Sequence, residues 1–470
     1  MPNYGGFHRS WIQNHNKYKT QCNSLSAAWM IFISGGMKIA WAIYEQPLVK
    51  SHNSIFGLIH TTISWFIGVI VGTKFATMFV QRFSKNVANC ISGVLVIISG
   101  SVFTFFRDPC IGVIVGRYID GCAFGITILQ AIVTGGEVST RLLRGTVLST
   151  ERVFLWVGIF GQICLSTIYF DKANHQNDFI TEDQIHGIVS IILGLLSLIC
   201  TAMFAIESPV YLHINHRESE SIRSLMKLQQ SKHPTNDIFE IFDDNKLWIR
   251  ENAEQSFQEE IQNGMLVFLK LVFLRSLVSL ALSLPFHWAF HLCSRMAFDS
   301  NMLLVGYGFL GLLGSVLSVL FMDTIGRRLT ASFSLCIGGT LLFAIAGTFL
   351  EFETTIDLAD KMKVVTILLL VYQFINAFGL APATTIYMSE AFALPLKSCF
   401  IAGIIVVDNL IQVITCVLAF NMTVDYSAFF FTVGVLNCVG GLVVVFWLPE
   451  TKKLTLRECY HRFSRSGDVT

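Results

Sequence analysis

Three polar residues interrupt a long apolar run near Val406: Asp408, Asn409 and Gln412. On a helix, positions i, i+1 and i+4 lie within about 100° of one face, so the three side chains point the same way. A carboxylate beside two amides can bind a polar solute or a cation. An ionisable side chain inside an apolar segment is costly and usually faces a water-filled cavity or an opposite charge. Asp408 is therefore the best single candidate for contact with a substrate or ion.

Charged residues also occur in matching boxes, one set in each half of the chain. The boxes are Gln81 to Lys85 with Asp323 to Arg328, Glu137 and Arg144 with Glu390 and Lys397, and Glu207 with Glu450. Their offsets are 242 (323 minus 81), 253 (390 minus 137) and 243 (450 minus 207). Each box lies where an apolar run meets a charged loop, which predicts two homologous halves in tandem. A parallel repeat suits a transporter that binds its substrate between the halves and releases it by rocking one against the other.

The elements that carry these residues are long apolar segments. The chain has 470 residues, 53% of them hydrophobic and 14% charged, with a mean hydropathy of +0.60. That composition is too apolar for a soluble globule of this length. A membrane-crossing helix needs ~20 apolar residues, and about twelve such runs flank a charged middle segment. The sequence predicts an all-α membrane protein with a six-helix bundle at 1–206, a helical linker at 207–262, a second six-helix bundle at 263–450 and a tail at 451–470.

The distribution of charge predicts which side of the membrane each loop faces. Basic residues gather in the loops of one side, among them Arg82, Arg144 and Arg327, as the positive-inside rule expects of cytosolic loops. The polar amino-terminal segment is not followed by the short apolar core of a cleaved signal peptide. We therefore expect both termini in the cytosol. In the charged linker, apolar residues at helical spacing favour short amphipathic cytosolic helices over the alternative of a disordered connection.

Composition and motif content narrow the classes of function. A net charge of +1 offers no basic face for nucleic acid. The twelve cysteines lie mostly inside apolar runs without Cys-x-x-Cys spacing, which is typical of packing residues. His287 and His291 share a helical face, but without a third ligand in view they favour a hydrogen-bonded or cavity-lining pair over a metal site. No nucleophile elbow, phosphate-binding glycine loop or His-Glu-x-x-His motif is present, so we expect neither an enzyme nor a cofactor.

Seven short stretches occur in a recognisable order along the chain. They are Phe79 to Asn86, Gly116 to Gly121, Gly136 to Gly145, Glu207 to Leu212, Asp323 to Arg328, Glu390 to Lys397 and Leu448 to Lys452. In these stretches the chain resembles sugar porters of the major facilitator superfamily, and among them the facilitative hexose transporters. The resemblance implies the major facilitator fold, with about twelve transmembrane helices in two bundles.

The same resemblance implies a latch at the cytosolic side. Its basic residues would meet its acidic residues when that side is closed, and Arg side chains can grip carboxylates with two parallel hydrogen bonds. The implied members are Arg82, Glu137, Arg144, Glu207, Asp323, Arg327, Arg328, Glu390, Lys397 and Glu450. Several such pairs together would form a reversible gate with two states.

The chain departs from the family where the family binds its sugar. When the sequence is aligned on Arg144 and Gly158, a glutamine of the fifth span falls at Arg152. The implied substrate site comprises Arg152, His287, Thr385, Asp408, Asn409 and Gln412. Arg152 lies eight residues beyond Arg144 (152 minus 144), so its side chain can either face the cavity or extend back to the cytosol.

The resemblance implies alternating-access transport of a small polar solute, with a hexose or a related sugar or polyol as the default substrate. The first span carries Lys38, and its one acid, Glu45, lies near the outer end, which favours a facilitative uniporter over proton coupling. The altered cavity leaves open a transporter of a charged organic solute, and a non-transporting membrane sensor of solutes is the alternative from another class. We expect the substrate and the lipid bilayer as partners, and the plasma membrane from the resemblance alone.

Overall fold

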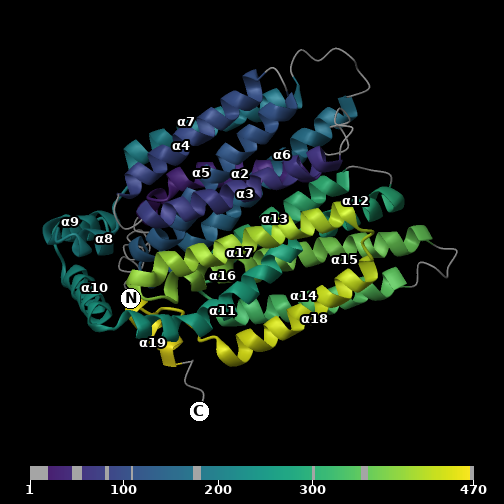
Figure 1. The fold of residues 1–470 in the computed structure, drawn as a ribbon. Helices are drawn as coiled ribbons and strands as arrows, with labels where there is room; N and C mark the ends of the chain where they lie inside the picture. Colours follow the sequence, from purple (N-terminus) through teal and green to yellow (C-terminus); the bar gives the residue numbers. More distant parts are fainter. Residues whose placement is uncertain are drawn as a thin grey trace, which may run out of the picture.

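The computed structural model describes residues 19–44, 55–79, 84–106, 109–172, 181–298, 302–350 and 358–465. Within these residues the chain is helical and contains no strand. Two helical bundles lie side by side, one purple to blue and one green to yellow, and short helices between them in sequence gather at one end (Figure 1). We call this end, which carries α8 to α10 and α19, the linker end. The predicted all-α fold is confirmed.

The elements follow one another in two similar sets. The first bundle contains α2 (Ser26–Tyr44), α3 (Ile55–Phe79), α4 (Lys85–Phe105), α5 (Pro109–Val138), α6 (Arg144–Lys172) and α7 (Glu182–Phe204). The linker contains α8 (Pro209–Ile214), α9 (Glu218–Leu228) and α10 (Asn236–Glu254). The second bundle contains α11 (Phe257–Ala281), α12 (Leu284–Phe298), α13 (Met302–Phe321), α14 (Arg327–Leu350), α15 (Leu358–Phe378), α16 (Leu380–Glu390), α17 (Leu394–Asn421) and α18 (Tyr426–Trp447), and α19 (Leu456–Arg465) follows it.

The helices account for the expected number of membrane spans. Among the described residues, 11 helical segments are long and apolar enough to cross a bilayer, and two of them consist of α11 with α12 and of α15 with α16. The 19-residue α2 packs inside the first bundle against α6 and α7 and completes six spans there. The main contacts between the bundles join α6 to α13 and α3 to α17.

Two spans of the second bundle are broken, a feature that the sequence analysis did not predict. In one span α11 ends at Ala281, four residues before Pro285. In the other, α15 ends at Phe378, four residues before Pro382. Proline has no N–H, so it cannot donate to the carbonyl four residues earlier, and its ring clashes with that carbonyl. Broken spans leave backbone carbonyls for other partners near the membrane centre.

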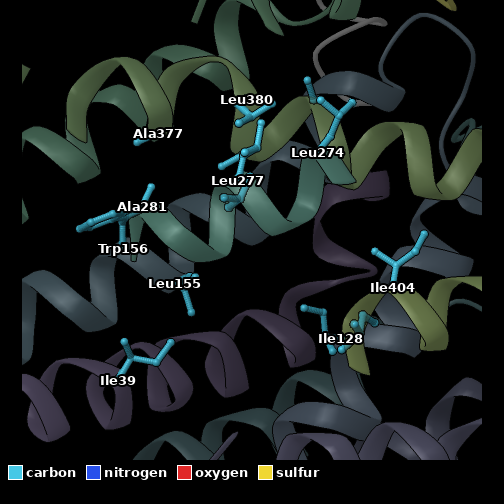
Figure 2. Close-up of a cluster of buried hydrophobic side chains, with 14 of the residues drawn as sticks. Ile39, Ile128, Leu155, Trp156, Leu274, Leu277, Ala281, Ala377, Leu380 and Ile404 are labelled. Carbon is cyan, nitrogen blue, oxygen red and sulfur yellow. The ribbon is translucent and has the colours of Figure 1, made fainter. Parts of the chain in front are cut away.

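Apolar side chains of both bundles meet in a shared core (Figure 2). The labelled residues are Ile39, Ile128, Leu155 and Trp156 of the first bundle and Leu274, Leu277, Ala281, Ala377, Leu380 and Ile404 of the second, and all are buried. In a bilayer the surrounding lipid is as apolar as these side chains, so apolar contact alone gives little preference for association. Polar contacts between the bundles therefore carry much of the preference for one arrangement.

Glycines allow α2 and α6 to approach backbone to backbone. A Cβ added at Gly158 would lie 2.0 Å from the carbonyl oxygen of Ile33, and one added at Gly36 would lie 2.1 Å from that of Leu155. Small residues at helix crossings commonly permit such close contact in membranes. The contact fixes α6, which carries Glu151 and Arg152, firmly against the first span.

Charged contacts at the linker end tie α19 to the linker. Arg457 of α19 donates two hydrogen bonds to Glu251 of α10, one of them from Nε at 2.9 Å, and His461 Nε2 lies 3.1 Å from the same carboxylate. The hydrogen bonds from Arg457 lower the pKa of the Glu251 carboxyl below its ordinary value of 4.5. Docking of α19 is thereby linked to the charge of Glu251.

We expect α19 to leave α10 in acid. Because the pKa of Glu251 is lowered in the docked state, its contribution is fully present above pH 4.5 and is lost as the pH falls through the lowered value. Spin labels on α10 and α19 should therefore separate on acidification. The Glu251→Gln variant should show the longer distance already at neutral pH. If wild type and variant give the same pH profile, Glu251 does not control the docking.

Candidate functional site

A cavity between the two bundles contains the polar residues predicted near Val406. Its walls come from α2, α3, α5 and α6 on one side and from α11 and α17 on the other, and its volume is about 50 Å³. Small-molecule pockets usually enclose ~300–1,000 Å³, so the cavity is contracted here and has to widen to admit a solute. Its charged, amide and hydroxyl members are Glu151, Arg152, Arg275, Ser279, Asp408, Asn409 and Gln412.

Four charged side chains and one hydroxyl form a continuous chain beside this cavity. Arg152 Nε lies 3.1 Å from Glu151 Oε2, both on α6. Thr385 Oγ1 of α16 donates to the same carboxylate oxygen at 3.2 Å and accepts from Arg275 Nη1 at 3.3 Å. Arg275 Nε of α11 donates to Asp408 Oδ2 of α17 at 2.8 Å. The polar chain, as we name these five residues, thus connects the first bundle to three helices of the second.

Three atoms of the polar chain lack a hydrogen-bond partner within the described residues. They are the donors Arg152 Nε and Nη2 and the acceptor Glu151 Oε1. Both side chains are buried, at 2% and 5% exposed. A buried donor or acceptor without a partner is destabilising, by ~1–3 kcal/mol or more for charged groups. A hydroxyl both accepts and donates, so the hydroxyls of a solute can accept from the guanidinium and donate to the carboxylate.

The structure settles the orientation that the sequence analysis left open for Arg152. Its side chain lines the cavity and pairs with Glu151 instead of extending to the linker end. Arg275 was not among the predicted site residues. The available signal was its position inside an apolar run, where an ionisable residue requires a partner. Asp408 of α17, which the spacing did predict, is that partner.

The other predicted substrate residues differ in their surroundings. Gln412 Nε2 donates to the carbonyl of Ser279 at 2.7 Å, close to the break after α11, and Asn409 Nδ2 donates to the carbonyl of Ile405 at 2.8 Å. Both still line the cavity. His287 does not, and its surroundings form a separate network.

That second network lies inside the second bundle. His287 Nδ1 is 3.0 Å from the carbonyl oxygen of Ser283, and its Nε2 is 3.3 Å from Tyr307 Oη, which donates to Gln373 at 2.7 Å. The described part of the chain contains no group of three His, Cys, Asp or Glu side chains that could hold a metal ion. The structure therefore places His287 in the packing of α12 against α13 and α15.

Buried ion pairs connect the two bundles at the linker end. Arg144 Nη1, at the start of α6, lies 3.2 Å from Glu390 Oε1 at the end of α16. Arg327 Nη2, at the start of α14 in the same bundle as Glu390, lies 3.5 Å from the same oxygen and holds that carboxylate from its own side. Lys397 Nζ of α17 lies 3.7 Å from Glu137 Oε1 of α5. The pairs Arg144 with Glu390 and Lys397 with Glu137 are the same contact with the two halves exchanged, as a tandem repeat requires.

Asp323 adds a second type of contact between the bundles. It accepts hydrogen bonds from the backbone N–H groups of Gly145 at 3.0 Å and Thr146 at 2.6 Å, and it pairs with Arg327 at 3.2 Å. A Cβ added at Gly145 would lie 2.5 Å from Asp323 Oδ1, so only glycine admits the carboxylate here. The loop before α14 is therefore docked on the amino-terminal end of α6, where N–H groups and the helix dipole favour an anion.

Glu207 and Glu450 bind helix ends of their own bundles, where the resemblance implied basic side chains. Glu207 accepts from the first two N–H groups of α4, at 3.3 Å each, and Glu450 from the first two of α14, at 3.2 and 3.0 Å. The first N–H groups of a helix have no partner inside it, which explains this choice. Gly326, with φ of +113°, makes the turn that exposes these groups to Glu450.

Two other latch candidates lie elsewhere. The guanidinium of Arg328 donates to the carbonyl of Val445, at the end of α18. Arg82 lies outside the described residues. Contacts between the bundles thus join Arg144 to Glu390, Lys397 to Glu137, and Asp323 to the start of α6. Arg327 supports Asp323 and Glu390 from within the second bundle. With these contacts formed, the linker end is closed.

Comparison with known proteins identifies the family. Residues 16–463 match the model of the family described as "Sugar (and other) transporter". The chain belongs to this transporter family. The resemblance seen in the seven sequence stretches is confirmed, and this family member is a membrane transporter and not an enzyme.

Relatives of this sugar transporter family match along most of their length. The facilitated glucose transporter member 1 of solute carrier family 2 from Gallus gallus is 23% identical over 444 residues, covering 90% of this chain and 86% of the relative. The sugar transport protein MST4 from Oryza sativa subsp. japonica is 23% identical over 436 residues, covering 89% and 81%.

Solved structures share the fold. The proton:xylose symporter XylE of E. coli, bound to 6-bromo-6-deoxy-D-glucose, gives a TM-score of 0.77 at 16% identity, covering 93% of this chain and 98% of that one. The human organic anion transporter MFSD10 gives a TM-score of 0.60 at 12% identity, covering 90% and 99%. The chain therefore has the major facilitator fold.

Proposed function

We propose that this family member is a facilitative transporter of a sugar or a related polyol that works by alternating access. The observation that carries the proposal is a set of buried atoms at the central cavity, Arg152 Nε and Nη2 and Glu151 Oε1, that have no hydrogen-bond partner within the described part of the chain. A sugar hydroxyl can accept from the guanidinium and donate to the carboxylate. The names of the two relatives, a facilitated glucose transporter and a sugar transport protein, support the same substrate class.

The latch supports the mechanism. Closing contacts at the linker end are reciprocal between the bundles, and each is a polar contact that water can replace once the bundles part. A gate built of such pairs can have two states of similar free energy. In our proposal, breaking the latch opens the linker end while the central cavity empties towards that side. A sensor without transport would have no need for both halves of the gate.

The side of the membrane and the mode of transport follow from charge. Arg144, Arg327 and Lys397 gather at the linker end, so we assign this end to the cytosol by the positive-inside rule. The plasma membrane as the host membrane rests on the family resemblance alone. The described first span, α2, contains Lys38 and no acidic residue. Without a carboxylate there to carry a proton, uniport is favoured.

One feature favours a second candidate, a transporter of organic anions. Arg275 and Asp408 form an ion pair at 2.8 Å that lines the cavity. A substrate carboxylate can take the place of Asp408 on the guanidinium, because Arg binds carboxylates of any source with the same geometry. The structural neighbour MFSD10 is named as an organic anion transporter, which supports the same solute class.

Tracer uptake into proteoliposomes tests both candidates. Glucose, fructose, inositol and small organic anions should be compared with and without a pH gradient. Saturable sugar uptake that does not respond to the gradient is expected. Uptake of anions alone would replace the first candidate by the second, and acceleration by a proton gradient would contradict uniport. Absence of uptake for every solute would favour the sensor.

We expect Arg152→Met to lower sugar uptake by roughly 10- to 100-fold, because one hydrogen bond from a charged group contributes ~1.5–3 kcal/mol. Arg250→Met is the matched control, since Arg250 pairs with Glu254 on the exposed face of α10. Initial rates at equal protein in the bilayer provide the measurement. Equal loss in both variants, or none in Arg152→Met, would remove Arg152 from the site.

A further inference from the structure

A larger cavity of about 440 Å³ lies at the linker end, apart from the central cavity. Its walls are the start of α4, the end of α5, the linker helices α8 and α10, and the start of α17. The volume falls within the ~300–1,000 Å³ typical of small-molecule sites. Both bundles and the linker contribute, so these walls converge only while the linker end is closed.

Among the described residues, Lys85 is the charged group of this cavity that makes neither a hydrogen bond nor an ion pair; Lys397 Nζ also lacks a hydrogen bond but lies 3.7 Å from Glu137. Lys85 lies at the start of α4, is 3% exposed, and its Nζ makes no hydrogen bond within the described residues. A buried ammonium without a partner is strongly destabilising. A ligand with a negatively charged acceptor would remove this cost.

The carboxylates of the same cavity are already engaged. Glu137 pairs with Lys397 at 3.7 Å and accepts a hydrogen bond from Ser208. Glu207 accepts from the first two N–H groups of α4. Asn252 is engaged too, because its Nδ2 donates to a carbonyl and its Oδ1 accepts from the N–H of Leu394. Two ammonium groups and two carboxylates thus line the cavity, and each carboxylate already accepts hydrogen bonds or an ion pair, whereas Lys85 Nζ has no hydrogen-bond acceptor within the described residues.

The rest of the cavity lining is largely apolar and favours a ligand with an apolar part. Apolar side chains come from α5, α8, α10 and α17, and they are Val133, Ile214, Ile249, Ala253, Leu394 and Pro395. Burial of apolar surface on them adds ~25 cal/mol for each Å² removed from water. A small inorganic anion would satisfy Lys85 but leave most of this surface uncovered.

We propose that this cavity binds an amphipathic anion, with a phosphate or carboxylate group on Lys85 and an apolar body against α10 and α17, and that the bound anion holds the linker end closed. Lys85 and Val133 belong to the first bundle, and Leu394 and Pro395 to the second. Opening of the linker end separates these walls, so the ligand binds only the closed state and shifts the population towards that state. The effect on transport rests on the proposed function, whereas the binding site does not.

Thermal unfolding in phosphatidylcholine nanodiscs tests the site without any transport. Hexyl phosphate should raise the unfolding midpoint saturably, by roughly 2–5 °C. Hexanol and hexylamine, which share the apolar body, should not. An equal rise with hexanol would overturn the proposal, because the apolar body alone would then account for binding.

Three variants locate the effect. Lys85→Met keeps the length of the side chain and removes the charge, and Ala253→Phe narrows the cavity from an exposed position of α10. Both should lose the rise with hexyl phosphate. Lys227→Met, on the exposed face of α9 and outside the cavity lining, should keep it. A rise that persists in Lys85→Met and Ala253→Phe would place the binding elsewhere and overturn the proposal.

Two further arms identify the source and the consequence. Nanodiscs with phosphatidylglycerol test an anionic lipid as the ligand. A rise of the unfolding midpoint in these nanodiscs that Lys85→Met abolishes supports a lipid as the source of the anion. A rise of the midpoint with hexyl phosphate alone supports a soluble anion. Hexyl phosphate inside proteoliposomes should slow uptake at least about tenfold in wild type and not in Lys85→Met. Binding without slower uptake would overturn the closing role and leave the transport proposal intact. Absence of all transport with intact binding would overturn the proposed function and leave the binding site in place.

Discussion

Replacing Glu390 with glutamine should open the linker end in most molecules. Glu390 is 1% exposed and faces two guanidinium groups, those of Arg144 and Arg327. Removing one partner of a buried ion pair typically costs ~3–5 kcal/mol, because the opposite charge stays buried without compensation. Such a loss changes the ratio of closed to open molecules by roughly 10²–10⁴-fold. Both guanidinium groups regain water when the bundles part.

Cys459 of α19 provides a native reporter of that opening. Its side chain is 0% exposed, and Arg144 Nη1 lies 3.9 Å from its Sγ. Burial, with the Glu390 carboxylate nearby, raises the pKa of the Cys459 thiol, so the closed state reacts slowly with maleimides. In a variant whose only cysteine is Cys459, Glu390→Gln should accelerate labelling from the cytosolic side at least about tenfold.

Two controls separate opening from a change in thiol chemistry. Removing the Glu390 charge also lowers the pKa of the Cys459 thiol, whereas removing the Arg327 charge raises it. Faster labelling in both Glu390→Gln and Arg327→Met can therefore only come from opening. Glu254→Gln, in the exposed pair with Arg250, should label like wild type. Wild-type labelling in Glu390→Gln would contradict the latch.

Asp408→Asn should have opposite effects on the two candidate substrates. The substitution leaves Arg275 charged and without its ion-pair partner beside the cavity. A polyol cannot supply the missing charge, so we expect sugar uptake to fall by roughly 100-fold, in line with the ~3 kcal/mol or more lost when a buried pair is broken. An organic anion can supply it, and its apparent affinity should rise.

Concentration series of labelled sugar and labelled organic anion in the same proteoliposomes provide the measurement. Asp243→Asn, on the exposed side of α10, serves as the matched control. The double variant Arg275→Met with Asp408→Leu removes both charges and should restore stability without restoring sugar uptake. Wild-type kinetics in Asp408→Asn for every transported solute would exclude the pair from the substrate site.

Local sequence patterns predicted the membrane helices and the two homologous halves, because short stretches of sequence determine both. Apolar runs of membrane length and boxes at nearly constant offsets require no knowledge of tertiary contacts. The breaks before Pro285 and Pro382 were harder to predict. A proline inside a membrane helix can kink it or end it, and the outcome depends on how neighbouring helices satisfy the freed backbone groups.

The site shows the same division between local and tertiary information. Asp408, Asn409 and Gln412 share a helical face by their spacing alone, and the structure places all three at the cavity. Arg275 escaped prediction because its partner lies 133 residues away and only the packing of α11 on α17 joins them. Alignment placed His287 in the site, but the turn at Ser283 directs its ring into the second bundle.

The capping contacts of Glu207 and Glu450 have a consequence for biogenesis. Glu207, after the last helix of the first bundle, binds the start of α4. Glu450, after the last helix of the second bundle, binds the start of α14. During synthesis the contact of Glu207 with α4 can form once residue 207 has emerged, before any of α11 exists. Folding units generally form in the order in which the ribosome delivers them. The two bundles can therefore fold one after the other, joined by the linker. We expect the two halves, expressed as separate chains, to assemble into one protein.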